Sequence, residues 1–116
     1  MTVQEAYESL KKTGIQTVYG GYEQKCTLPC VTLNATSSSY SGSDDGCCLV
    51  ETLKLEVNLY TKNKDVNTEY KILEIFSSEN EIERTERYIF EEKVYENCFT
   101  ISTTNKLYKE WFYVFN

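Results

Sequence analysis

Leu53-Lys54-Leu55-Glu56-Val57-Asn58-Leu59-Tyr60-Thr61 is the most regularly patterned stretch of this 116-residue sequence. Leucine and valine occupy every second position from 53 to 59, with polar residues between them. Successive side chains of a strand point to opposite faces of a sheet, so this alternation predicts a strand with one buried and one solvent-facing side. We expect the other elements to cover the buried side or to extend the sheet beside it.

The residues after this strand predict a helix. Asp65 suits the N-cap position, and Val66, Tyr70, Leu73 and Phe76 recur at the spacing of one helical face, which Ile72 and Ile75 widen. We expect this face to pack on the sheet.

A second helix is predicted at the start of the sequence. Thr2 and Glu5 have the spacing of a capping box, and residues 3–10 carry apolar side chains at helical spacing. Gly14 suits a left-handed C-terminal cap. Residues 15–19 are rich in β-branched and aromatic side chains and stop at a glycine pair, which predicts a short strand.

The region before the central strand is predicted to hold one strand and one long loop. Pro29 marks a strand start or an edge because proline cannot donate to a ladder, and a strand is expected over residues 31–37. Residues 37–46 show no hydrophobic period and are almost all turn formers, which predicts a flexible loop. Loops of this length in a compact domain are often functional.

The last third of the sequence predicts a hairpin and an aromatic end. Residues 83–90 and 94–103 read as antiparallel strands joined by a turn at Glu91-Glu92-Lys93. Residues 107–115 are strongly apolar, and they either complete the core as a strand or short helix or contact a partner.

These elements define an α+β domain: an antiparallel or mixed sheet of four to five strands, with the N-terminal helix and the second helix on one face. We expect one domain over residues 1–106, followed by an aromatic segment over residues 107–116. A chain of this length can bury one modest core.

Composition limits the partners and the compartment. With 18 acidic and 12 basic residues and a net charge of −6, the surface is not suited to bind nucleic acid through phosphates. The N-terminal residues lack a secretion-signal pattern, and no segment approaches the roughly 20 apolar residues of a membrane span. We therefore expect a cytoplasmic protein that does not bind membranes.

The cysteines and carboxylates give no sign of a catalytic or metal site. Cys26-x-x-x-Cys30 and Cys47-Cys48 lack the spacing of zinc ligands, the sequence has no histidine, and the five thiols are expected to be reduced. The pairs Asp44-Asp45 and Glu91-Glu92 are adjacent residues whose side chains point apart. We predict no cofactor, no metal and no enzymatic activity.

Two segments of the sequence resemble a known family. Leu55-Glu56-Val57-Asn58-Leu59-Tyr60-Thr61-Lys62-Asn63-Lys64-Asp65 is similar to a strand ending in Leu-Tyr-Thr-Lys with an Asp that starts a helix, and Glu83-Arg84-Thr85-Glu86-Arg87-Tyr88-Ile89-Phe90-Glu91-Glu92-Lys93-Val94-Tyr95-Glu96 is similar to a hairpin with a Glu-Lys-Val/Leu-Tyr turn. Together with Val18-Tyr19-Gly20, they resemble the small tail-completion proteins of long-tailed phages and prophages of Gram-positive bacteria. These are tail terminator or head-to-tail joining proteins, often labelled minor capsid or minor structural proteins.

The resemblance covers residues 1–103 and departs from the family in two places. Pro29-Cys30-Val31 and residues 40–45 match the family's strand and acidic loop only loosely, and the aromatic end extends beyond the usual pattern. The resemblance implies a non-enzymatic virion protein that forms a ring, expected to be a hexamer, on the tail tube protein and docks the head completion or connector protein. It would be made in the bacterial cytoplasm, as a monomer in solution before assembly, and end at the head–tail interface of the virion.

The candidate partner-binding residues lie in the predicted loop and in the aromatic end. They are Ser38, Tyr40, Asp44, Asp45, Trp111, Phe112 and Phe115. The alternatives are a small cytoplasmic α+β enzyme or a cysteine-based metal-binding module, and an acidic adaptor for a host protein.

Overall fold

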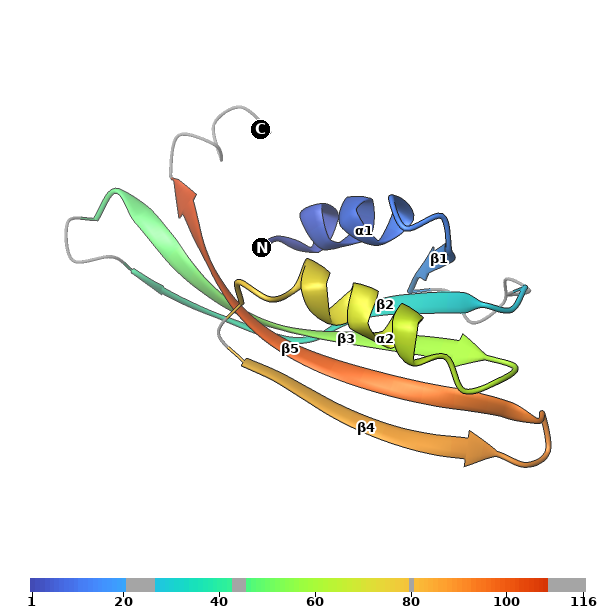
Figure 1. Cartoon of the computed structure of the whole chain (residues 1–116). Helices are drawn as coiled ribbons and strands as arrows, with labels where there is room; N and C mark the ends of the chain where they lie inside the picture. Colours follow the sequence, from blue (N-terminus) through green and yellow to red (C-terminus); the bar gives the residue numbers. More distant parts are fainter. Residues whose placement is uncertain (21–26, 43–45, 80, 109–116) are drawn as a thin grey trace.

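The computed structural model describes residues 1–20, 27–42, 46–79 and 81–108. Two helices lie on one face of a five-stranded sheet with the order β1-β2-β3-β5-β4 (Figure 1). β1 pairs with β2 in parallel and all other neighbours are antiparallel, so the sheet is mixed and the α+β prediction is confirmed. The elements are α1 (Val3–Lys11), β1 (Gln16–Tyr19), β2 (Cys30–Gly42), β3 (Cys48–Thr61), α2 (Val66–Ile75), β4 (Glu81–Ile89) and β5 (Val94–Tyr108).

β3 is the middle strand, and the patterned stretch forms its second part. The four apolar side chains of that stretch are no more than 3% exposed, whereas Lys54 between them is exposed. The predicted apolar side of the strand is therefore confirmed, whereas on the predicted solvent-facing side Asn58 is buried at 8% exposed.

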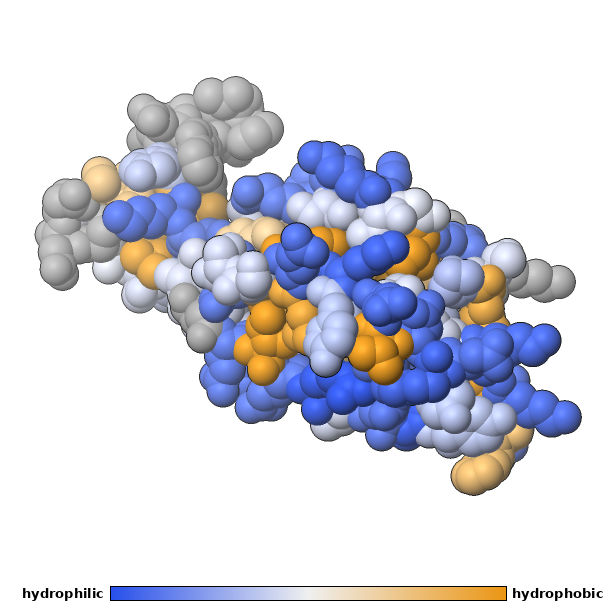
Figure 2. All heavy atoms as spheres, in the orientation of Figure 1, coloured by the Kyte–Doolittle hydropathy of each residue, from blue (hydrophilic) through white to orange (hydrophobic). Residues whose placement is uncertain are grey.

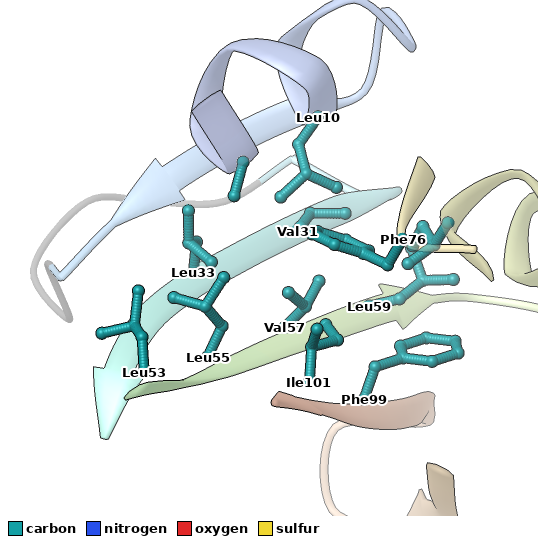
Figure 3. Packing of buried hydrophobic residues seen from close by; sticks show 12 residues of the cluster. Leu10, Val31, Leu33, Leu53, Leu55, Val57, Leu59, Phe76, Phe99 and Ile101 are labelled. Atoms are coloured by element: carbon teal, nitrogen blue, oxygen red, sulfur yellow. The ribbon is translucent and has the colours of Figure 1, made fainter. Parts of the chain in front are cut away.

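The core fills the space between the helices and the sheet. Figure 3 shows side chains from β2, β3 and β5 facing Leu10 of α1 and Phe76 at the end of α2. Burying one such side chain contributes about 1.5–3 kcal/mol, which makes this layer the main source of stability. The sheet residues of the core are Val31, Leu33, Leu53, Leu55, Val57, Leu59, Phe99 and Ile101.

Both predicted helix starts are confirmed. The Thr2 hydroxyl accepts from the Glu5 amide at 3.2 Å, and the Glu5 carboxylate accepts from the Thr2 amide at 3.1 Å. At the second helix, the Asp65 carboxylate accepts from the Thr68 amide at 3.2 Å. Gly14 has a φ of 81°, the left-handed conformation expected after the first helix.

The predicted buried face of α2 is partly wrong. Val66 is 44% exposed and Tyr70 is 65% exposed, while Glu69 and Ile72 are buried. The Glu69 side of the helix faces the sheet, because the Glu69 carboxylate forms ion pairs with Lys64 and with Arg84 of β4. Ile72 and Phe76 are buried as predicted.

The prediction of a flexible loop is wrong for residues 37–42. They continue β2 and pair with β3, with Ser38 opposite Leu53 and Tyr40 opposite Glu51. Strand propensity depends mainly on the partner strand, and here the half-buried first part of β3 supplies the pairing that the serine-rich sequence does not indicate. The register shifts at Thr36, between Ala35 and Ser37, which marks a β-bulge.

The hairpin of β4 and β5 is confirmed, with a turn in which Lys93 has a φ of 56°. β5 continues to Tyr108, so Leu107 and Tyr108 of the aromatic segment are strand residues. The rest of that segment lies outside the described residues. Within the ranges that the structure describes, neither helix has the length and apolar character to cross a membrane.

Candidate functional site

Three strands extend together beyond the two outer strands of the sheet (Figure 1). We call this three-stranded part the arm; it consists of residues 37–42 of β2, 48–54 of β3 and 102–108 of β5. Pairing with β4 begins at Ser102, and pairing with β1 ends at Leu33, so neither outer strand continues alongside the arm. The molecule is elongated as a result, with extents of 51 × 27 × 23 Å.

The backbone direction along β2 follows from one hydrogen bond. The Leu33 carbonyl accepts from the Gly20 amide at 3.2 Å, so Leu33 points its backbone groups away from β3. Backbone groups of successive strand residues point alternately towards and away from the neighbouring strand, and the bulge adds one residue to β2. The N–H and C=O groups of Ser38, Tyr40 and Gly42 therefore also point away from β3. Among the described residues, no strand pairs with this outer edge.

The two sheet edges differ sharply in charge. β4 has five charged residues among nine, a common protection of an edge against unwanted strand pairing. β2 has none among its thirteen residues, and within the arm it consists of serines, Tyr40 and Gly42. The arm edge of β2 is therefore open to pairing with another strand.

The structure places two of the seven predicted site residues together. Ser38 and Tyr40 lie two positions apart on the arm edge, on the same side of the sheet, and Tyr40 is 56% exposed. The other five, Asp44, Asp45, Trp111, Phe112 and Phe115, lie outside the described residues.

A cluster of charged residues joins α2 to β4 and β5. The Glu69 carboxylate pairs with Lys64 Nζ at 2.7 Å and with Arg84 Nη2 at 2.6 Å, and Lys64 also bonds the Glu86 carboxylate. Arg84 Nε donates to Asn97 Oδ1 at 2.9 Å. The hydrogen bond from Lys64 holds the pKa of Glu86 below its ordinary value, and the two carboxylates raise the pKa of Lys64. This cluster fixes α2 on the sheet.

A shallow hollow of about 260 Å³ lies beside this cluster. Val66, Tyr70 and Leu73 of α2 line it together with charged residues, and Figure 2 shows apolar side chains gathered over α2. The sequence pattern indicates these apolar residues but assigns them to the core.

An exposed aromatic cluster lies at the turn between β4 and β5. The Tyr88 ring is 5.0 Å from Phe90 and 4.9 Å from Tyr95, measured between centroids, and Phe90 is 81% exposed. The sequence pattern does not indicate this cluster, which forms because Ile89 pairs with Val94 and so places Tyr88 opposite Tyr95.

The face of the sheet opposite the helices is polar, and the pKa values of Tyr60 and Cys98 on this face are raised. Burial and the neighbouring Glu96 raise the pKa of Tyr60 well above its ordinary value. Burial also raises the pKa of the Cys98 thiol, which makes it a weak nucleophile at neutral pH.

Among the cysteines that the structure describes, Cys30 departs from the expectation. Cys30 is disulfide-bonded, whereas Cys47, Cys48 and Cys98 are thiols. The expectation of reduced thiols depended on the compartment, which does not determine which sulfur atoms lie close together. Across the described ranges, no group of three or more cysteine, aspartate or glutamate side chains could hold a metal ion.

Comparisons with known proteins give no family for this chain. No protein-family model matches the sequence, and no curated protein matches it.

Proposed function

We propose that this chain is a structural virion protein that completes a phage tail and joins it to the head connector, assembling as a ring on the tail tube. The family resemblance of the β3 to α2 segment and of the β4 to β5 hairpin motivates the proposal. The observation that supports it most is the arm: it extends beyond the two outer strands of the sheet, and one of its edges is uncharged and open to pairing.

A ring needs two different surfaces on each copy, one of which binds the other on the next copy. The arm edge of β2 is one such surface, and the aromatic cluster of Tyr88, Phe90 and Tyr95 lies at the β4–β5 turn, away from the arm (Figure 1). Exposed aromatic residues are enriched at protein interfaces. In the proposed ring, the arm edge of β2 would contact a neighbouring copy, and the aromatic cluster would contact the tail tube or the connector.

The net charge of −6 suits a protein through which DNA passes. An acidic ring repels phosphates, so DNA would move through it without being held.

Inactivation of the gene in the phage or prophage that carries it tests this function. We expect filled heads and separate tails by electron microscopy, and joined particles once the wild-type gene is supplied in trans. A variant gene with a stop codon after residue 40, which removes β3 and most of the core, should fail to restore joining. Joined, infectious particles without the gene product would contradict the proposal.

A further inference from the structure

We propose that residues 109–116 of one copy add as a strand to the arm edge of β2 in the next copy. The inference rests on the proposed ring and names the contact that closes it. The acceptor is the edge formed by Ser38, Tyr40 and Gly42, whose backbone groups point away from β3.

The acceptor edge is suited to an uncharged partner strand. It has no charged residue and no proline, and its three outward-facing residues present alternate N–H and C=O groups. Two chains that each carry a charge of −6 repel one another, and an uncharged edge is where they can approach most closely.

The donor is identified by sequence and by position. Trp111-Phe112-Tyr113-Val114-Phe115 is a run of five residues with high strand propensity and no charge. It follows Tyr108, which pairs with Cys48 at the outer end of the arm. Residues 109–116 span about 26 Å when extended, which is enough to cover the six-residue edge of about 20 Å.

Geometry places the donor on a neighbouring copy rather than on its own. A strand added outside β2 lies three strand spacings, about 14 Å, from β5 of the same chain. The chain from Tyr108 to Trp111 extends only about 10 Å. The aromatic run therefore cannot lie in full along the edge of its own chain, and donation from one arm to the next gives the heterologous contact that a ring requires.

The test uses two variants with complementary defects. A chain ending at Tyr108 keeps the acceptor edge and lacks the donor. Tyr40→Pro keeps the donor and loses the outward N–H at Tyr40, without removing a bond to β3. Tyr40→Thr is the matched control, because it removes the ring and keeps the N–H.

Sedimentation should show that the wild type and Tyr40→Thr self-associate and that each defective variant alone is monomeric. An equimolar mixture of the two defective variants should form a one-to-one dimer and nothing larger. Circular dichroism establishes that each variant is folded, and Ser38→Pro replaces Tyr40→Pro if the latter unfolds.

Each other result overturns the inference. A wild type that stays monomeric, a mixture without dimer, or association of Tyr40→Pro excludes strand donation to this edge. Association of the chain ending at Tyr108 indicates instead that two β2 edges pair with each other. Co-sedimentation with tail tubes separates the two proposals. Binding to the tubes without strand donation would support the proposed function and contradict this inference. Strand donation without binding to the tubes would support this inference and contradict the proposed function.

Discussion

The carboxylate of Glu69 is only 6% exposed, and its partners Lys64 and Arg84 are each more than a third exposed. The buried charge therefore belongs to Glu69 alone. Helical periodicity places position 69 on the core-facing side, because it lies three residues before Ile72 and seven before Phe76. A glutamate at this position, however, gives no indication in the sequence that it is buried. The pairing partners come from a loop and from β4, and the sequence does not show that they meet.

This arrangement predicts unequal effects of removing the two ends of the ion pair. Arg84→Met leaves the buried Glu69 carboxylate with Lys64 alone and should lower the free energy of unfolding by about 2 kcal/mol. Glu69→Leu removes the buried charge and should change stability by less than about 1 kcal/mol. Urea denaturation measures both, and a larger loss for Glu69→Leu would contradict this account.

The hydrogen bonds of Asp65 predict that the free energy of unfolding depends on pH. Hydrogen bonds from the Thr68 hydroxyl and amide hold the pKa of Asp65 below its ordinary value. The carboxylate therefore contributes its full stabilisation at pH values above the ordinary pKa of an aspartate, about 3.9. This stabilisation is lost as the pH falls through the lower pKa that Asp65 has in the folded protein. Asp65→Ala should cost about 1 kcal/mol at pH 7 and less at pH 2.5.

The control for this prediction is Asn63→Ala, a change at an exposed loop residue two positions earlier. Its effect on stability should be small at both pH values. An Asp65→Ala effect of equal size at pH 7 and pH 2.5 would show that the carboxylate charge does not matter.

At the scale of elements, the sequence predicts those whose pattern lies in their own residues. The second part of β3 has a clear two-residue period, α1 has a capping box, and the hairpin has a turn between two alternating strands. The end of β2 has no such pattern, because its strand forms by pairing with β3 and it has little apolar surface to bury. The sequence therefore indicates Ser38 and Tyr40 as candidate binding residues but predicts a loop where they form a strand.

The central strand predicts a sharp contrast between two adjacent residues. Leu55 is fully buried against the helices, so Leu55→Ala should lower the free energy of unfolding by about 3 kcal/mol through lost burial and a cavity. Lys54 points to the other face and is exposed. Lys54→Ala should therefore change the free energy of unfolding by less than about 0.5 kcal/mol. Similar losses for the two variants would contradict the orientation of β3.

At the scale of the whole molecule, an uncharged contact between acidic copies predicts a distinctive response to salt. Each copy carries a charge of −6, so screening should strengthen self-association as the salt concentration rises from about 0.02 to 0.5 M. Sedimentation at both concentrations measures the change. Weaker association at high salt would indicate that opposite charges, rather than the arm edge of β2, hold the copies together.

Amide hydrogen exchange along β2, resolved residue by residue, tests the central claim that the arm edge is the surface for assembly. In the monomer, the amides of Ser37, Ser39 and Ser41 should be protected by pairing with β3, whereas those of Ser38 and Tyr40 should exchange rapidly. In the assembled protein, Ser38 and Tyr40 should become protected as well. Unchanged, rapid exchange at Ser38 and Tyr40 after assembly would contradict the account.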